Sequence, residues 1–191
     1  MKPSLLITCG VEGVGKDIVD FFAPNSLSLS RRNGYDIGLS KDRQKIIEKS
    51  LEYDIFVNHA HNGHFEGQVA LLYEVYYAWK KSRKSGYIIN IGSYSTYNIG
   101  KGFRRYAVLK YALDIASQQC CKEIENGLTS FRMTNIKPGM LDTPKSQKKP
   151  HWTGVGIRGG YLAEMIAWLY ALPPDLLVPE AVLAPVNQFP F

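Results

Sequence analysis

Short apolar, β-prone runs alternate with helical segments along most of this chain, and this alternation limits the possible fold more than any other feature. Residues 5–8 (LLIT) form the first such run, and a glycine-punctuated turn and a helical stretch to about residue 22 follow. Strands that alternate with helices are typical of a parallel sheet covered by helices on both faces. We therefore expect an α/β fold with a doubly wound parallel sheet.

The same pattern predicts the positions of the remaining elements. Strands are expected at residues 26–30, 54–58, 87–91, 129–136 and 176–183, with a very short one at 35–37, and helices at 41–51, 69–79, 106–124 and 160–171. Ligands of such sheets bind at the carboxyl ends of the strands. Polar or glycine residues follow three predicted strand ends, after Thr8, Asn58 and Ile91.

Composition agrees with an ordinary globular protein. The chain has 191 residues, of which 45% are hydrophobic and 21% charged, and residues 1–191 are expected to form one domain because no linker or repeat is visible. No apolar run reaches the ~18 residues of a membrane span, and the first apolar stretch is too short for a secretory signal. The three cysteines do not suggest a disulfide framework, so we expect a cytoplasmic protein.

The net charge of +6 comes from short local clusters of lysine and arginine. No helix carries a basic stripe interleaved with aromatic residues, so neither nucleic acid nor a membrane is an expected partner. Arg31 and Arg32 are the exception that we interpret further, because a pair of guanidinium groups suits a phosphorylated ligand.

A glycine-rich turn, CGVEGVGK, follows the first strand. Gly10, Gly13 and Gly15 allow a tight turn and a close approach of a ligand to the backbone. The helix that begins behind them offers free N–H groups to a phosphate. On its own, such a turn is more often only a structural turn than a binding site.

Three later residues could carry acid–base chemistry. Tyr106 and Lys110 are four residues apart on a predicted helix, so their side chains lie on one face. A nearby ammonium group favours the phenolate and lowers a pKa that begins near ~10. Ser93 ends the strand IINIGS, where its hydroxyl could bind the same substrate oxygen as the tyrosine.

Taken together, these motifs resemble the short-chain dehydrogenase/reductase family. The resemblance covers residues 5–143: the glycine turn, IINIGS, YAVLK thirteen residues after Ser93, and PGMLDT downstream. It implies a Rossmann-type fold and an oxidoreductase that interconverts a carbonyl and an alcohol by hydride transfer, with Ser93, Tyr106 and Lys110 as the catalytic set.

The resemblance also implies a cofactor site. The residues expected to bind the dinucleotide are Gly10, Gly13, Val14, Gly15, Arg31, Arg32, Asp36, Asn58, His59, Ala60, Tyr106, Lys110, Pro138, Gly139 and Thr143. Within this set, Lys110 would bind the nicotinamide ribose, Thr143 the carboxamide, and Asp36 would lie near the adenine.

The residues at the end of the second predicted strand indicate whether NAD(H) or NADP(H) is the expected cofactor. An NAD site usually has an acidic residue there for the ribose 2′-hydroxyl. Here the segment reads Ser30-Arg31-Arg32-Asn33, and two guanidinium groups suit a 2′-phosphate. NADP(H) is therefore preferred over NAD(H).

The chain departs from the family pattern in three places. Cys9 stands where the family's first glycine is expected, so either the turn is shifted by one residue or Cys9 adopts a glycine-like φ. The segment Asn58–His61 reads NHAH in place of Asn-Asn-Ala-Gly. The helix asparagine of many members has no clear match, and Asn62 or Gln68 would have to substitute for it.

Two alternative functions follow from these departures and from the histidines. The chain could be a non-catalytic NADP(H)-binding sensor or assembly subunit. It could also be a metal-dependent hydrolase that uses His59, His61 and His64, an HxHxxH pattern directly after a strand. Because Gly63 lacks the carboxylate that such hydrolases carry there, we expect no metal.

The resemblance finally implies partners. Two helices of this family commonly form a four-helix interface, and the segments at 69–79 and 106–124 are rich in apolar residues. A homodimer or homotetramer is therefore expected, together with a small carbonyl or alcohol substrate. Aromatic residues and lysines around the predicted pocket indicate a partly apolar, anionic substrate.

Overall fold

Six parallel strands form a single sheet in the order β2-β1-β3-β4-β5-β6. The computed structural model describes residues 2–97, 105–150 and 152–186. The strands are β1 (Leu5–Thr8), β2 (Ser26–Leu29), β3 (Ile55–Asn58), β4 (Gly86–Ile91), β5 (Phe131–Pro138) and β6 (Glu180–Leu183). Because β2 and β3 lie on opposite sides of β1, the winding reverses at β1, where a ligand crevice is expected.

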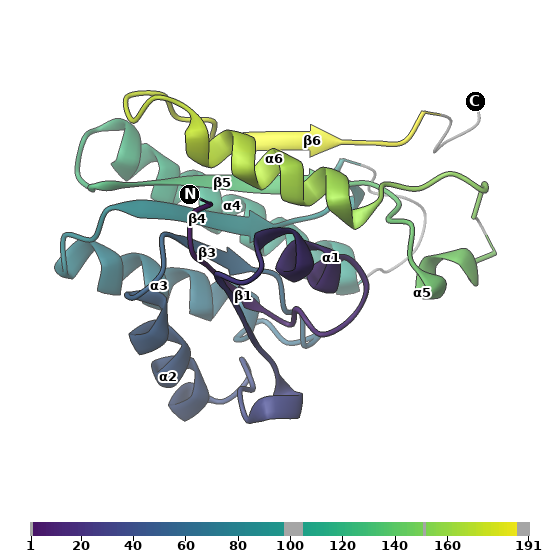
Figure 1. Ribbon diagram of the computed structural model, residues 1–191, viewed down its shortest axis with the longest axis horizontal. Coiled ribbons are helices and arrows are strands. Elements are labelled where there is room, and N and C mark those ends of the chain that lie inside the picture. Colours follow the sequence, from purple (N-terminus) through teal and green to yellow (C-terminus); the bar gives the residue numbers. More distant parts are fainter. Residues whose placement is uncertain (1, 98–104, 151, 187–191) are drawn as a thin grey trace.

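Helices cover both faces of this sheet, as the alternation predicts (Figure 1). They are α1 (Gly13–Phe22), α2 (Ser40–Ser50), α3 (Gln68–Lys81), α4 (Arg105–Glu125), α5 (Pro144–Gln147) and α6 (Gly159–Ala171), with 3-10 turns η1 (Arg31–Asn33) and η2 (Tyr94–Thr96). Helices α1 and α6 share one apolar core, and α2, α3 and α4 share the other. The prediction of a doubly wound parallel sheet is confirmed.

Alternate side chains of each central strand enter different cores. Leu6, Phe56 and Ile88 belong to the core under α2, α3 and α4. Their neighbours Leu5, Ile7, Ile55 and Val57 belong to the core under α1 and α6. Since both faces are buried, the strands read as continuous apolar runs, which is why the sequence identifies them well.

Two predicted strands differ from the structure. Residues 35–37 lie in the loop between η1 and α2, and Ile37 enters the core without pairing with a strand. The last strand begins at Glu180, four residues later than predicted. Both segments contain β-prone residues, but strand formation needs a partner strand in register, which a short local pattern does not reveal.

The contact between α1 and α6 gives a test of the fold at two adjacent glycines. A methyl group at Gly159 would lie 2.6 Å from Cβ of Asp17, whereas at Gly160 it would meet no atom within 4 Å. We expect Gly159→Ala to destabilise the protein by about 1–3 kcal/mol through overpacking. The matched Gly160→Ala should be neutral or stabilise it by up to about 1 kcal/mol. Urea unfolding measures both, and equal effects would contradict this helix packing.

Candidate active site

The glycine-rich turn after β1 bends at Cys9. Cys9 has a φ of 64°, in the left-handed region that favours glycine, and Gly13 has a φ of 53°. Of the two possibilities left open by the sequence, the structure therefore has Cys9 in a glycine-like conformation. The turn keeps its shape with a non-glycine residue at a position where such a φ is uncommon.

Close packing explains the other two glycines of the turn. A Cβ atom at Gly10 would lie 2.6 Å from Cγ2 of Val19, and one at Gly15 would collide with the carbonyl oxygen of Cys9. Behind the turn, the Glu12 side chain makes no cap hydrogen bond to α1. The first N–H groups of α1 are thus left for other acceptors. Val14 lies in the core, so only its backbone can face a ligand.

Thr8 joins this turn to the segment that follows β3. Its hydroxyl oxygen accepts hydrogen bonds from the backbone N–H groups of His59 (3.0 Å) and Ala60 (2.9 Å). The His59 Nδ1 atom lies 3.1 Å from the carbonyl oxygen of Cys9. Burial and the positive charge of Lys110 lower the pKa of His59 to about 4, so the imidazole is neutral at pH 7. These contacts hold together two of the predicted cofactor-binding segments, the glycine turn after β1 and the segment after β3.

The arginine pair lies at the end of β2, on η1, and both side chains are exposed. Arg32 forms an ion pair with Glu12 at 2.9 Å, which places it beside the glycine turn. The Asp36 carboxylate accepts a hydrogen bond from the backbone of Gly38 (2.8 Å). A Cβ atom added to Gly38 would lie 2.9 Å from the Asn62 side chain. The loop around Asp36 therefore reaches the segment after β3.

Ser93 and Tyr106 lie close together, although they belong to different elements. Ser93 is 8% exposed and begins η2, where its hydroxyl accepts a hydrogen bond from the Ser95 hydroxyl (2.9 Å). Burial raises the pKa of Tyr106, and a hydrogen bond with Ser93 offsets part of this increase. The phenol is thus protonated at neutral pH. Its pKa shift is opposite to the one that the tyrosine–lysine spacing predicts.

Lys110 is buried one helical turn after Tyr106. Its side-chain nitrogen donates to the side-chain oxygen of Gln68 (2.8 Å) and to the carbonyl oxygen of Ile91 (2.7 Å). It lies 5.7 Å from the centre of the Tyr106 ring. Burial lowers the pKa of Lys110 to about 7, and the carboxylate of Asp114 acts in the opposite direction.

The sequence left undecided whether Gln68 or Asn62 takes the place of the helix asparagine in this site. From the first turn of α3, the Gln68 amide nitrogen donates to the carbonyl oxygens of Asn58 (2.7 Å) and Ile91 (3.2 Å), while its oxygen accepts from Lys110. Of the two candidates Asn62 and Gln68, Gln68 is thus the one against the lysine. Only its position in the helix after NHAH pointed to it.

The loop after β5 closes over the glycine turn. The Gly139 N–H donates to Leu183 of β6 (2.7 Å), which continues the sheet past Pro138. Thr143 begins α5, and its hydroxyl oxygen accepts from the Ser146 backbone (3.1 Å). Its methyl group lies 3.6 Å from the position of a Cβ on Gly13. Thr143 therefore stands beside the N-terminus of α1.

The three histidines after β3 do not converge. His59 faces the glycine turn, and His61 packs its ring edge-on against Tyr106, with ring centres 5.1 Å apart. Within residues 2–97, 105–150 and 152–186, no group of three His, Cys, Asp or Glu side chains could hold a metal ion. The arrangement gives no support to the metal-dependent hydrolase.

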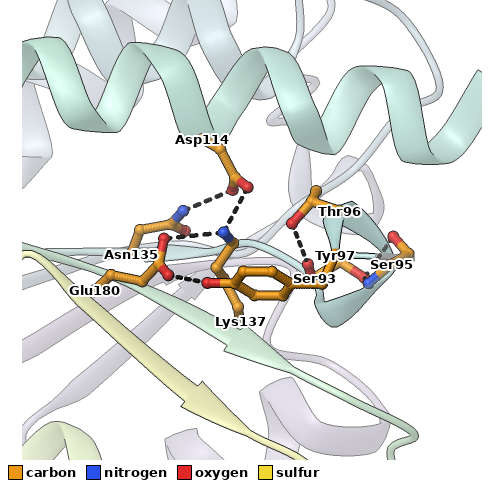
Figure 2. Close-up of polar contacts among 8 residues, drawn as sticks. All are labelled: Ser93, Ser95, Thr96, Tyr97, Asp114, Asn135, Lys137 and Glu180. Carbon is orange, nitrogen blue, oxygen red and sulfur yellow. Dashed lines mark hydrogen bonds and ion pairs between the residues drawn. The ribbon is translucent and has the colours of Figure 1, made fainter. Parts of the chain in front are cut away.

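An ion-pair network around Lys137 lies beside Ser93 (Figure 2). Lys137 of β5 pairs with Asp114 of α4 at 2.7 Å and with Glu180 of β6 at 2.9 Å. The ammonium group of Lys137 also lies 4.1 Å from the centre of the Tyr97 ring, whose hydroxyl bonds Glu180. These carboxylates raise the pKa of Lys137 although burial lowers it. No motif in the sequence indicated this network.

Solved structures with the same arrangement of elements are oxidoreductases. A 3-ketoacyl-(acyl-carrier-protein) reductase from Brucella melitensis complexed with NADH has a TM-score of 0.75 at 17% identity, over 95% of this chain and 96% of that one. An alcohol dehydrogenase from Thermococcus sibiricus complexed with 5-hydroxy-NADP has a TM-score of 0.75 at 18% identity, over 98% and 99%. A serine dehydrogenase complexed with NADP+ has a TM-score of 0.74 at 18% identity, over 97% and 96%. The chain has the Rossmann-type α/β fold of these enzymes.

Sequence comparison gives more limited matches, which cover about half of this chain. The chain is 31% identical over 105 residues to an uncharacterized oxidoreductase of Staphylococcus saprophyticus and 29% identical over 104 residues to one of Staphylococcus epidermidis. The matches cover 55% and 54% of this chain and 44% of each relative, so less than half of either relative's length is matched. No model of a protein family matches the chain.

One further property concerns membranes. Among the helices of residues 2–97, 105–150 and 152–186, none combines the length and the apolar character that a membrane span requires.

The buried amine of Lys110 should make the stability of the protein depend on pH. An unfolded lysine keeps its ordinary pKa of 10.5, whereas folding lowers the pKa of Lys110 to about 7. Between these values the unfolded state binds more protons, so stability rises with pH. From about pH 7 to about pH 8.5, the unfolding free energy should increase by about 1–2 kcal/mol more in the wild type than in Lys110→Met. Urea unfolding at several pH values tests this, and parallel curves would contradict it.

Proposed function

We propose that the protein is an NADP(H)-dependent oxidoreductase that interconverts a carbonyl and an alcohol. The observation that supports this most strongly is the gathering of Ser93, Tyr106 and Lys110 at the carboxyl end of β4, although they come from a strand end and a helix. The glycine turn of β1 lies next to them through His59 and His61. When bound, the dinucleotide supplies or takes the hydride.

The residues present fit a dinucleotide at this edge of the sheet. The backbone of Gly10 and Gly15 leaves no room for side chains, and the N-terminus of α1 has no side-chain cap, so a pyrophosphate could approach it. We assign Gly10, Gly13, Val14 and Gly15 to the pyrophosphate, with Val14 acting through its backbone. Arg31, Arg32 and Asp36 would bind the adenosine half, and Lys110 and Thr143 the nicotinamide half. The remaining residues that we assign to the dinucleotide are Asn58, His59, Ala60, Tyr106, Pro138 and Gly139.

The protonated phenol of Tyr106 can act as a general acid when a carbonyl is reduced. Because its pKa is raised, Tyr106 holds its proton at neutral pH and can donate it to a substrate oxygen. Ser93 would hold the same oxygen by a hydrogen bond. A protonated Lys110 would stabilise the tyrosinate that remains, and Gln68 orients the lysine through its side-chain oxygen.

The printed names of similar proteins support the reaction class. The relatives are named oxidoreductases, and the solved structures with this fold include one complexed with NADH and one with NADP+. The chain matches less than half the length of the named relatives, so activity is our proposal for this protein. The alternative, a non-catalytic NADP(H)-binding protein, is supported by the four-residue α5, which covers little of a substrate pocket.

Removal of the Tyr106 hydroxyl tests catalysis. We expect Tyr106→Phe to lower turnover of NADPH with an aldehyde and ketone panel by about 100-fold or more, because general acid catalysis contributes at least that much. NADPH affinity, measured by calorimetry, should stay nearly unchanged. Tyr161→Phe, at an exposed position of α6 outside the proposed site, is the control and should keep full turnover. Cofactor binding without turnover in the wild type would instead favour the non-catalytic alternative.

The two arginines test the choice of dinucleotide. In the double variant Arg31→Ala/Arg32→Ala we expect the NADPH dissociation constant to rise about 10–100-fold, since hydrogen bonds to a charged group contribute about 1.5–3 kcal/mol. NADH affinity should change by less than about threefold. Lys81→Ala, another exposed cation, serves as the control. Equal losses for NADPH and NADH would refute the 2′-phosphate assignment.

We also propose that a second copy of the chain covers α3 and α4. The helices expose large apolar side chains that the resemblance assigns to a subunit interface: Tyr77 (57%), Val108 (47%), Tyr111 (46%) and Ile115 (46%). A homodimer or homotetramer would bury them.

The cytoplasmic location stays a prediction. The three cysteines that suggested it, Cys9, Cys120 and Cys121, are free thiols.

A further inference from the structure

Asp114 lies one helical turn after Lys110 on α4, and both residues are buried, at 4% and 3% exposure. Side chains four residues apart on a helix are neighbours, and a buried carboxylate and ammonium in this relation attract strongly. Yet the two do not pair. The Lys110 nitrogen instead contacts two neutral oxygens, those of Gln68 and Ile91.

Both carboxylate oxygens of Asp114 are occupied from the other side (Figure 2). Lys137 of β5 lies 2.7 Å from one oxygen, and the Asn135 amide nitrogen donates to the other at 2.8 Å. The Asp114 and Lys137 side chains are each 5% exposed. A buried charge without a partner is costly, so Lys137 satisfies the carboxylate that would otherwise turn toward Lys110.

The position of Lys137 suits this task. Its Cγ lies 3.2 Å from the position of a Cβ on Gly92, immediately before Ser93, so the network borders the catalytic strand end. Glu180 and the Tyr97 ring complete the surroundings of its ammonium group. A lysine here holds the carboxylate of Asp114 toward β5.

We propose that Lys137, with Asn135, holds the carboxylate of Asp114 away from Lys110 and so keeps the Lys110 amine directed at Gln68, Ile91 and the side of Tyr106. Lys137 is then a positioning residue that acts through Asp114. The consequence for catalysis rests on the proposed oxidoreductase function, whereas the position and charge of Lys110 do not.

The titratable groups around Lys110 indicate how its titration should change when Lys137 is replaced. They are Asp114 and Tyr106 on α4, and His59 and His61 on the segment after β3. Both imidazoles are neutral at pH 7 because their pKa is about 4, and Tyr106 is protonated. Within this set, the Asp114 carboxylate is the group that favours the charged form of Lys110. Its release from Lys137 should stabilise the charged form of Lys110.

Side-chain NMR titration of the Lys110 ammonium group tests this directly, with its signal assigned by its loss in Lys110→Met. In Lys137→Met the titration midpoint should rise by about one pH unit or more, as for a lysine that gains an anionic neighbour. In the double variant Asp114→Asn/Lys137→Met, which removes the competing carboxylate, the midpoint should return to the wild-type value or below it. If Lys137→Met does not fold, Lys137→Gln keeps a donor to Asp114 and should give a smaller upward shift.

Two controls separate this effect from general damage. Lys80→Met breaks the ion pair of Lys80 with Glu123 at the far end of α4 (2.6 Å) and should leave Lys110 unchanged. Lys137→Arg keeps the positive charge and should also leave it unchanged. An unchanged midpoint in both Lys137→Met and Lys137→Gln would overturn the proposal, as would a raised midpoint that Asp114→Asn fails to reverse.

Activity then distinguishes this proposal from the proposed function. If the wild type turns over NADPH, we expect Lys137→Met to lose turnover. Adding Asp114→Asn should restore that turnover at least in part. A different outcome is that the wild type shows no turnover while the Lys110 midpoint still rises in Lys137→Met. That result would contradict the oxidoreductase proposal but support the role of Lys137.

Discussion

The buried amine of Lys110 is the interaction on which the candidate site depends. It enters the space between α3, α4 and the end of β4, where water is scarce, and it contacts two neutral oxygens. These contacts connect the segments after β3 and β4 to the helix that carries Tyr106. Because burial lowers the pKa of Lys110 to about 7, the folded protein carries a group that can change charge near neutral pH.

A second polar layer surrounds this amine and keeps its neighbours in place. Asn58 donates to the carbonyl oxygen of Gln68 (2.9 Å) and to the side-chain oxygen of Asn90 (3.0 Å), so three strand and helix ends share one network. The Lys137–Asp114 pair lies beside it and shares α4 with Lys110. Buried polar groups of this kind stabilise little relative to apolar packing, but they fix where each charge points.

Sequence reasoning could predict the sheet and the identity of most candidate site residues. Continuous apolar runs identified β1, β3 and β4, and the glycine turn identified the start of α1, because both depend on neighbours in sequence. It could not predict that residues 35–37 lack a partner strand. It also gave the wrong direction for the pKa of Tyr106, since the spacing to Lys110 says nothing about the desolvation that raises this pKa.

The amino-acid sequence alone determined the doubly wound sheet, the Tyr106–Lys110 helix face and the arginine pair after β2, because period, spacing and residue type carry that information locally. Only the tertiary structure decided that Cys9 takes the left-handed conformation, that Gln68 rather than Asn62 meets Lys110, and that Asp114 pairs with Lys137. The two pairings join residues 42 and 23 positions apart and form where separate elements meet. Contacts at such a distance depend on how helices pack on the sheet, and no local pattern in the chain records them.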